Sequence, residues 1–584
     1  MKKLLSGNEA IARGLYEYGC GVATAYPGTP STEIIESCVQ YKDTFYSQWS
    51  PNEKVAFEVA IGASFGGART LVAMKHVGVN VAADPLLTLT YSGIKGGFIL
   101  VSADDPGMHS SQNEQDNRYY AKFAKMPILE PADSQEAKDF VGIAFDISEK
   151  FDAPVLLRTT TRISHTKALV ELGERREKNS AEFVRNPTKY VMVPAHARKR
   201  HGIVEERTKK LTEYSENSPI NTVEMNDTSF GIITSGASYQ YVKDAFPNAS
   251  VMKIGMPYPF PIEKAKTFAK KVQKLYVVEE LEPFMEEMLK VAGVPCIGKD
   301  IIPICGELNQ NIIKAAILGN EEKIVASCFD ETTMPVRPPV LCPGCPHRGI
   351  FYTLNRLKAV VTGDIGCYTL GVAPPLSAMD TTIAMGASIG VNIGLEKAIG
   401  RDYSKKTVAV IGDSTFLHSG ITGLIDAVYN KGANTILLLD NRITAMTGRQ
   451  QNPSTGKTLL GESTKEVNFV ELAKSVGVER VRVVDPYDLK AVETAIKEEM
   501  AADEVSVIIT NRPCMLIRGQ KFEEKKFAVN EDACINCGLC LKVGCPAVIK
   551  REDGKKARIT EKLCTGCSVC AQVCPKKAIE VVKA

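Results

Sequence analysis

The cysteines of this 584-residue chain are concentrated in one short segment. Of the 17 cysteines, eight lie between Cys534 and Cys574. A reducing cytosol keeps thiols free, and a dense group of cysteines in such a compartment indicates metal ligation rather than disulfides. This segment is therefore predicted to be a metal-binding domain.

The eight cysteines form two similar runs, each ending in Cys-Pro. The second run has the C-x2-C-x2-C-x3-C-P spacing of two-cluster ferredoxins, and the first has one more residue before its last cysteine. In such proteins each run gives three thiolates to one [4Fe–4S] cluster and its fourth to the other. The ligands expected for cluster one are Cys534, Cys537, Cys540 and Cys574. The ligands expected for cluster two are Cys545, Cys564, Cys567 and Cys570. The alternative is a pair of zinc knuckles.

The overall composition is that of a soluble globular protein, with 44% hydrophobic and 24% charged residues. The net charge is only +3 and no basic block stands out, so nucleic acid is not an expected partner. No apolar run approaches the roughly 18 residues of a membrane helix. The start resembles a signal peptide, but the polar residues 6–9 interrupt it. A cytoplasmic location without membrane contact is expected.

The length predicts about four domains. Short apolar runs alternate with helical segments, which predicts an α/β fold of parallel sheets covered by helices on both faces. The first α/β domain is expected at residues 1–170, followed by a charged linker with a helix at 171–227. A small α/β domain is expected at 228–330, a third α/β domain at 335–525 and the cysteine-rich domain at 526–584.

Two predicted strands in the third α/β domain end in residues suited to bind magnesium. One strand ends in Gly412-Asp413-Ser414, and the next is followed by Asn441. This arrangement resembles the GDG…N motif of thiamine-diphosphate enzymes, with Ser414 in place of the last glycine. Mg²⁺ prefers six oxygens and bridges to phosphates, and open α/β sheets bind ligands at the carboxyl ends of their strands. We expect Asp413, Asn441 and the carbonyl of Ile443 to hold Mg²⁺ and the diphosphate.

Thiamine chemistry also needs an acid that protonates the aminopyrimidine ring. Residues 52–63 resemble the helix of the pyrimidine-binding domain in this superfamily, where the catalytic Glu lies nine residues before a glycine. Glu53 has that spacing to Gly62. Glu58 is the rival, and the alternative for both is a solvated helix carboxylate. Such sites form between two protomers, so the resemblance also implies self-association of this chain.

Together these motifs resemble the 2-oxoacid:ferredoxin oxidoreductase family, and most closely the large (alpha) subunits of its indolepyruvate branch. Further markers are Tyr-Pro-Gly-Thr-Pro-Ser-Thr-Glu at 26–33, Cys-Pro-Gly-Cys-Pro-His at 342–347 and Gly-Asp-Ile-Gly-Cys at 363–367. The resemblance covers essentially the whole chain. It implies pyrimidine-binding, transketolase-C-terminal-like, diphosphate-binding and two-cluster ferredoxin domains in this order.

The implied activity is the oxidative decarboxylation of aryl pyruvates, such as indolepyruvate and phenylpyruvate, to aryl-acetyl-CoA and CO₂. The thiamine ring serves as the electron sink and a ferredoxin as the electron acceptor. Thr29 matches a family position that contacts the substrate. In the family a smaller beta subunit carries the catalytic-gamma domain, which implies an (alpha beta)2 heterotetramer.

Two alternatives to this activity remain. The first is the same chemistry on pyruvate or another aliphatic 2-oxoacid, because the sequence does not display the pocket that contacts the substrate side chain. The second is a non-catalytic electron-transfer subunit with a vestigial thiamine fold. The presence of Asp413, Asn441 and Glu53 argues against the second alternative.

The resemblance also implies a third [4Fe–4S] cluster close to the thiamine. Cys342, Cys345 and Cys367 match family members that carry a cluster in the diphosphate domain. The fourth expected ligand is Cys514, which follows the apolar run 505–509. Electrons leave the substrate singly, so a one-electron acceptor is needed nearby. The alternatives are a zinc site or free thiols.

Overall fold

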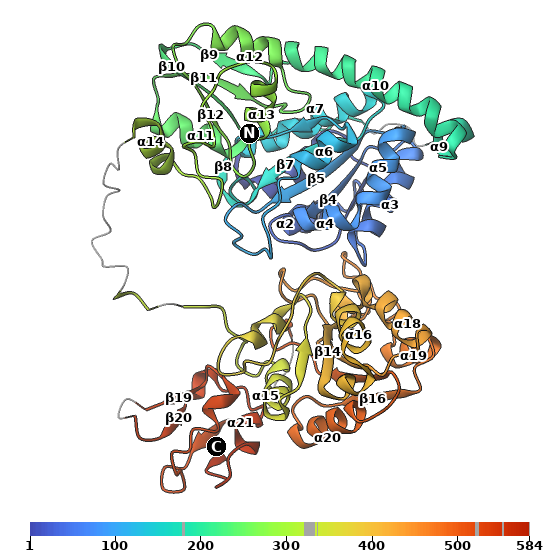
Figure 1. Cartoon of the computed structure of the whole chain (residues 1–584), viewed down its shortest axis with the longest axis vertical. Coiled ribbons are helices and arrows are strands. Elements are labelled where there is room, and N and C mark those ends of the chain that lie inside the picture. The colour runs from blue at the N-terminus through green and yellow to red at the C-terminus, as the bar shows by residue number, and fades with distance from the viewer. Residues whose placement is uncertain (178–181, 320–332, 336, 520–524, 552–553, 583–584) are drawn as a thin grey trace. The chain divides into compact units, whose positions relative to one another are not determined.

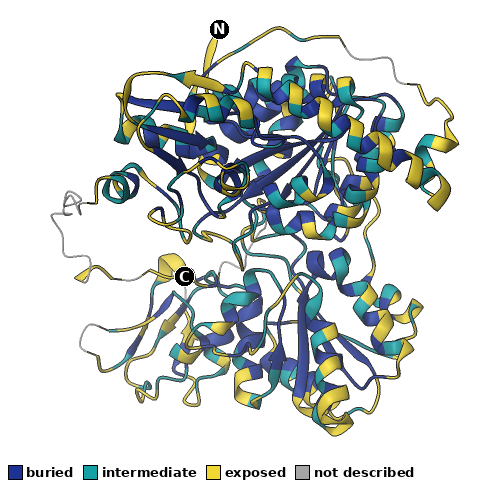
Figure 2. Cartoon of the chain, turned by 45° about the horizontal axis from the view of Figure 1, so that its top comes forward, coloured by how far each residue is buried: buried dark blue, intermediate teal, exposed yellow. Residues whose placement is uncertain are grey.

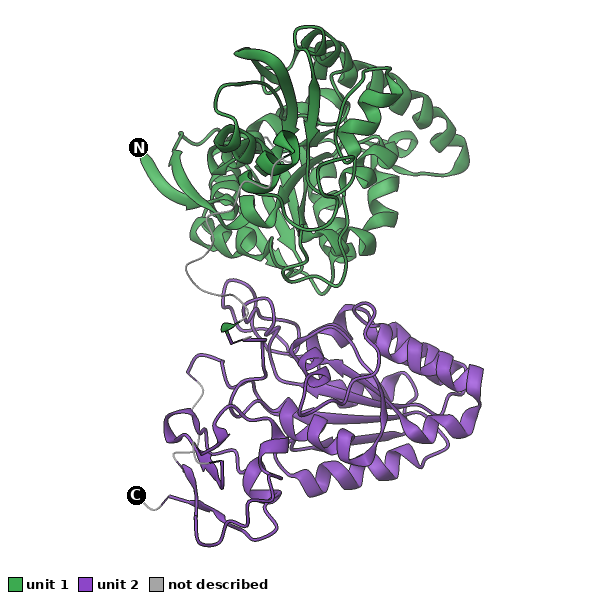
Figure 3. Cartoon of the chain, turned by 60° about the vertical axis from the view of Figure 1, so that its left-hand side comes forward, with its two compact units in different colours: residues 1–334 green, residues 335–584 purple. Residues whose placement is uncertain are grey.

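The computed structural model describes the chain except for residues 178–181, 320–332, 336, 520–524, 552–553 and 583–584. The chain forms two compact units, Met1–Met334 and Pro335–Ala584 (Figure 3). The predicted α/β architecture is confirmed in both units (Figure 1). Within the described residues, every helix is too short or too polar to span a bilayer.

The first unit is built on a six-stranded sheet in which every neighbouring pair is parallel. In spatial order its strands are β3 (Tyr46–Trp49), β2 (Val22–Ala25), β4 (Thr70–Lys75), β5 (Phe98–Asp104), β7 (Val155–Thr160) and β6 (Ile128–Leu129). Strands β4, β5 and β7 are buried at every position (Figure 2). Successive side chains of a strand point to opposite faces, so both faces of this sheet are covered.

Helices with well-defined starts contact this sheet. Helix α3 (Glu53–Phe65) contacts β2 and β4, and α7 (Ser134–Phe151) contacts β5 and β7. Each begins at a side chain that accepts a backbone N–H, Asn52 for α3 and Asp133 for α7. Such caps satisfy amides that have no partner inside the helix. The cap of α3 fixes where that helix begins, and its first residue is Glu53.

The first unit also contains a two-stranded sheet of β1 (Lys2–Ser6) and β8 (Lys167–Glu171) and a sheet of four strands. In spatial order the strands of the four-stranded sheet are β12 (Leu275–Val278), β10 (Asp227–Ser235), β11 (Ala249–Ile254) and β9 (Thr222–Glu224). Strand β9 lies in the range predicted as a linker and pairs antiparallel with β11. The same range contains the predicted helix, α10 (Pro194–Asn217), which contacts α5 (Ala83–Ser92) and buries Val204 and Leu211. The described part of this range therefore packs into the first unit.

The second unit is built on a five-stranded sheet, also with only parallel pairs. In spatial order its strands are β13 (Val360–Thr362), β14 (Thr407–Gly412), β15 (Thr435–Asp440), β17 (Ser506–Asn511) and β16 (Arg480–Val484). Strands β14 and β15 are buried at every position. They are direct neighbours, so their carboxyl ends lie side by side at one edge of the sheet.

The cysteine-rich segment forms two short antiparallel ribbons. Strand β18 (Phe527–Val529) pairs with β21 (Ile579–Val581), and β19 (Val548–Lys550) pairs with β20 (Ala557–Ile559). Its small core contains Cys540, Cys564 and Cys570 among apolar side chains. Val543 and Val569 of this segment pack against Leu489 at the start of α20 (Leu489–Met500). The cysteine-rich segment therefore packs against the α/β domain that contains the five-stranded sheet of the same unit.

Candidate functional site

Asp413 and Asn441 lie at the carboxyl ends of the adjacent strands β14 and β15. The chain turns immediately after Gly412, where a Cβ would stand 2.6 Å from Cε1 of Tyr368. A side chain at position 412 would therefore collide with that ring. Because position 412 is a glycine, the end of β14 can pack closely against Tyr368, and Asp413 follows directly after it. The two residues predicted to bind magnesium are thus brought to one edge of one sheet.

Asp413 is a buried carboxylate, 2% exposed. Its Oδ2 accepts hydrogen bonds from Ser454 Oγ at 3.2 Å and Asn452 Nδ2 at 3.4 Å. Burial, together with the nearby charge of Asp440, raises the pKa of Asp413 to about 7. A buried carboxylate without a counter-charge is costly, and a bound divalent cation would remove that cost. The residues at this edge therefore fit Mg²⁺ and a diphosphate.

Asn441 is held from the opposite side by a residue whose role the sequence did not reveal. Asn441 Nδ2 donates to Nε2 of His347, 3.2 Å away, in a buried contact. Burial lowers the pKa of His347 to about 4, so the ring is neutral and Nε2 is available as an acceptor. The Oδ1 of Asn441 accepts from the amide of Ile443 at 3.3 Å. Ser414 joins the same loop, because its Oγ accepts a hydrogen bond from Thr444 at 2.8 Å.

The four cysteines expected around a third cluster come together near this edge. The thiol of Cys345 interacts electrostatically with those of Cys342 and Cys367, and the thiol of Cys367 interacts with that of Cys514. Burial and the neighbouring thiols raise the pKa of Cys345 to about 12 and of Cys367 to about 11. The amide of Cys514 donates to the carbonyl of Asn441 at 2.9 Å. The cysteine group is therefore joined directly to the predicted magnesium loop.

The tail cysteines also sort into the two expected sets. The thiol of Cys540 interacts with those of Cys534, Cys537 and Cys574, which are the other ligands expected for cluster one. The thiol of Cys570 interacts with those of Cys545, Cys564 and Cys567, the other ligands expected for cluster two, and also with Cys540. Among the described residues, no three or more His, Cys, Asp or Glu side chains are arranged to hold a single metal ion.

The first unit holds the remaining predicted residues. Glu53 is 5% exposed, whereas the rival Glu58 is exposed and forms an ion pair with Lys54. A Cβ at Gly78 would stand 2.7 Å from Cγ of Glu53, so this glycine leaves room for the buried carboxylate. Glu58 is thus in the position of a solvated helix carboxylate, and Glu53 is not.

Thr29 lies in the turn after β2 and is half-buried. Its neighbour Gly28 approaches Lys75, the last residue of β4, so closely that a Cβ at position 28 would stand 3.0 Å from Lys75 Cβ. Lys75 Nζ donates to the carbonyl of Ser110 at 2.6 Å, and burial lowers its pKa to about 8. Lys75 is therefore a further candidate functional residue, at the carboxyl end of β4 in the first unit. The only signal for it in the sequence is a basic residue that ends an apolar run.

Three family descriptions match successive parts of the sequence. Residues 13–228 match "Pyruvate flavodoxin/ferredoxin oxidoreductase, thiamine diP-bdg" and residues 364–510 match "Thiamine pyrophosphate enzyme, C-terminal TPP binding domain". Residues 527–581 match "4Fe-4S dicluster domain". Thiamine diphosphate and iron–sulfur clusters are therefore cofactors of this protein.

Curated relatives extend the similarity over the whole chain. Indolepyruvate oxidoreductase subunit IorA of Pyrococcus horikoshii is 44% identical over 630 residues, covering 100% of this chain and 97% of that protein. The protein of the same name from Archaeoglobus fulgidus is 43% identical, covering 100% and 98%. The 2-oxoglutarate synthase subunit KorA of Archaeoglobus fulgidus is 24% identical over 345 residues, 52% of this chain and 96% of its own.

A solved structure of 2-oxoglutarate:ferredoxin oxidoreductase from Magnetococcus marinus superposes with a TM-score of 0.46 at 16% identity, covering 55% of this chain and 65% of that one. The full-length matches are far stronger, and they carry the name of one subunit of an oxidoreductase. The chain therefore belongs to the family of indolepyruvate oxidoreductase subunit IorA, and it is one subunit of an iron–sulfur-protein-dependent oxidoreductase that acts on a 2-oxo group.

Proposed function

We propose that this chain and a smaller beta subunit catalyse the coenzyme A-dependent oxidative decarboxylation of aryl pyruvates to aryl-acetyl-CoA and CO₂, with ferredoxin as electron acceptor. The full-length similarity to proteins named indolepyruvate oxidoreductase supports the aryl substrate. The similarity to a 2-oxoglutarate synthase subunit is lower and covers about half of the chain, so it favours an aliphatic substrate less. The observation that carries the proposal is the hydrogen bond from the amide of Cys514 to the carbonyl of Asn441, which joins a group of four cysteines to the Asp413–Asn441 edge.

At this edge Asp413, Asn441 and the carbonyl of Ile443 would hold Mg²⁺ and the diphosphate, with Gly412 and Ser414 shaping the loop. Thiamine diphosphate supplies the electron sink that makes decarboxylation of a 2-oxoacid possible. His347 would orient Asn441, because its Nε2 accepts from the amide nitrogen and leaves the amide oxygen, which also accepts from the amide of Ile443, available to Mg²⁺.

Two residues of the first unit would act on the other half of the cofactor and on the substrate. Glu53 would hold a proton for the aminopyrimidine ring, and its burial beside Gly78 supports this role over Glu58. Thr29 would contact the substrate from the turn after β2. In the proposed (alpha beta)2 assembly these residues would serve the diphosphate edge of the other alpha chain.

Three [4Fe–4S] clusters are proposed. The four cysteines joined to the magnesium loop would hold the third cluster, and the two tail sets would hold clusters one and two. The electrostatic grouping of the thiols supports each ligand set. Thiolates are the required ligands, so iron binding would displace the protons of the coordinating thiols.

The proposal is tested by expressing the chain with its beta subunit anaerobically and measuring dye reduction. Indolepyruvate, phenylpyruvate, pyruvate and 2-oxoglutarate are compared with and without coenzyme A. Faster reduction with the two aryl substrates, dependent on coenzyme A, is expected. A preference for pyruvate or 2-oxoglutarate would contradict the aryl assignment, and purified protein that binds no thiamine diphosphate would favour the non-catalytic alternative.

A further inference from the structure

Arg348 is a buried cation in the second unit, only 4% exposed. It is the second residue of α15 (His347–Leu357) and lies three residues after Cys345. No carboxylate in the described part of the chain forms an ion pair with it. Burying a charge without a counter-charge is costly. Negative charge beside this position would offset that cost.

The guanidinium of Arg348 joins two segments that are distant in sequence. On one side Nε and Nη2 donate to the carbonyl of Cys342 at 3.3 and 3.2 Å, and Nη2 also donates to that of Leu341. On the other side Nη1 donates to the carbonyl of Val543 at 3.4 Å and to that of Gly544. Gly544 immediately precedes the first cysteine expected for cluster two. One planar fork thus ties the third-cluster cysteines to the cluster-two cysteines.

The charges that face Arg348 also come from both sets. Its favourable electrostatic partners are the thiols of Cys545, Cys345, Cys342 and Cys567. Two of these belong to the third-cluster set and two to the cluster-two set. Cysteines ligate iron as thiolates, so bound clusters would place negative charge on both sides of the guanidinium. These thiolates would supply the counter-charge that no described carboxylate provides.

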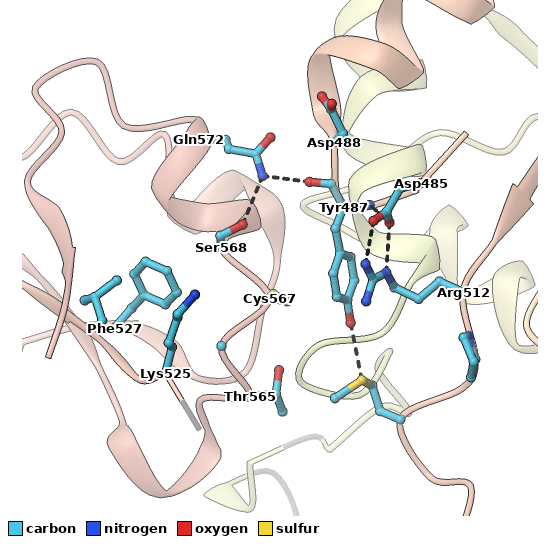
Figure 4. Close-up of a pocket in the computed structure, with 14 residues that line it drawn as sticks. Asp485, Tyr487, Asp488, Arg512, Lys525, Phe527, Thr565, Cys567, Ser568 and Gln572 are labelled. Atoms are coloured by element: carbon cyan, nitrogen blue, oxygen red, sulfur yellow. Dashed lines mark hydrogen bonds and ion pairs between the residues drawn. The ribbon is translucent and has the colours of Figure 1, made fainter. Parts of the chain in front are cut away.

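A second contact brings the same two sets together. Tyr487 interacts with both Cys567 and Cys345, and its hydroxyl donates to the carbonyl of Gly344. The loops are so close that a Cβ at Gly344 would stand 2.2 Å from Oγ1 of Thr565. Tyr487, Thr565 and Cys567 line one pocket of about 660 Å³ (Figure 4). The third-cluster and cluster-two cysteines therefore face each other across Arg348 and Tyr487.

Contacts around the tail segment hold this arrangement in place. Gln572 Nε2 donates to the carbonyl of Tyr487 at 2.7 Å (Figure 4). Its Oε1 accepts from the amide of Leu489 at 3.1 Å. The cluster-one set lies next to cluster two, because the thiol of Cys570 interacts with that of Cys540. Members of the cluster-two set therefore lie near members of both other sets.

We propose that Arg348 is the shared counter-ion and positioning residue of the third cluster and cluster two. The inference rests on the proposed third cluster. Reduction of a cluster by one electron adds negative charge, which a nearby guanidinium stabilises, so Arg348 raises the reduction potential of both clusters. Bound clusters would supply one-electron transfer here, in which the third cluster would give up the electron that cluster two takes up, and Arg348 would keep its charge between them. The hydrogen bonds of the guanidinium to residues 341–342 and 543–544 would hold the two ligand-bearing segments at a fixed separation for this transfer.

The test uses the anaerobic holoenzyme with its beta subunit and three variants. R348Q keeps hydrogen-bond donors but removes the charge, and R348K keeps the charge on a compact group that cannot face both sets at once. R356Q is the control, because Arg356 is an exposed residue of the same helix paired with Glu493. Iron and sulfide are counted for each protein, and midpoint potentials are measured by titration monitored with electron paramagnetic resonance.

We expect about twelve irons per chain in the wild type. In R348Q both the third-cluster and the cluster-two potentials should fall, with no shift in R356Q. Unchanged potentials in fully loaded R348Q would overturn the role of Arg348. If R348Q does not retain iron, the midpoint potentials of R348K are used instead. A lower potential at one or both of the two clusters in R348K would support the inference. Wild-type potentials at both clusters would overturn it. Eight irons in active wild type would instead contradict the third cluster, and with it the premise of this inference.

Discussion

Asn441 and His347 form a buried hydrogen bond in which the amide Nδ2 donates to the ring Nε2 across 3.2 Å. The contact joins the loop after β15 to the first residue of α15. It fixes the orientation of the Asn441 amide, because the nitrogen donates to the ring while the oxygen accepts from the amide of Ile443. It also connects the predicted magnesium loop to the segment that carries Cys342 and Cys345.

We therefore predict that H347A weakens the binding of Mg²⁺ and thiamine diphosphate. The loss should be roughly 10- to 100-fold in Kd, because a buried polar group left without its partner costs about 1–3 kcal/mol. Calorimetric titration of the cofactor into the purified protein measures this change. H201A serves as the control, since His201 lies on the exposed side of α10. Equal cofactor affinity in H347A and wild type would contradict the positioning role.

Replacement of Asp413 by Ala should abolish retention of thiamine diphosphate while leaving the iron and sulfide content unchanged. The carboxylate would be a direct metal ligand, whereas the cysteine sets would keep all of their ligands. Cofactor content after gel filtration and iron content of the same sample give the two readouts. Full turnover of D413A at saturating Mg²⁺ and cofactor is incompatible with the assigned site.

Glu53 and Glu58 form a matched pair five residues apart on α3. E53Q should bind the cofactor but lose about 10²- to 10⁴-fold in kcat, because the amide cannot supply a proton. E58Q should keep wild-type turnover, since Glu58 is exposed and paired with Lys54. Steady-state kinetics of both variants with saturating cofactor provide the comparison. The reverse pattern would assign the acid to Glu58.

The stability of the first unit should depend on pH through Glu280, a buried carboxyl whose Oε1 accepts from the amide of Leu308. Burial raises the pKa of Glu280 to about 7. The folded state therefore retains a proton that the unfolded chain releases above about pH 4.3. The free energy of unfolding should fall by on the order of 3 kcal/mol as the pH rises through this window to about 7.

E280Q should remove most of that pH dependence, because the amide stays neutral and its oxygen can still accept from Leu308. Thermal unfolding at pH 5 and pH 8 compares the variant with wild type. E282Q is the control, because Glu282 is exposed. An identical loss of stability between pH 5 and pH 8 in E280Q and wild type would assign the effect to other groups.

The buried strands of the two parallel sheets can be predicted from the sequence, because each contains a continuous run of apolar residues. The apolar runs that become β14 and β15 are continuous, and each is followed by a polar residue with a clear chemical use. Strand β9 was not predicted, because its Thr-Val-Glu is too short and polar to signal a strand and forms only by pairing with β11. The roles of His347 and Arg348 were not predictable either. Their partners Asn441 and Gly544 are brought to them only by the folded unit.

Thiamine diphosphate at the Asp413–Asn441 edge and the three cysteine sets would work together as one oxidoreductase. The most direct measurement is the cluster absorbance of the anaerobic holoenzyme after indolepyruvate is added, in wild type and in D413A. Indolepyruvate should bleach the iron–sulfur absorbance of wild type, because electrons pass from the substrate to the clusters, and should leave the absorbance of D413A unchanged. Wild-type clusters that stay oxidised with indolepyruvate but are reduced by dithionite, or equal bleaching in D413A, would contradict this prediction.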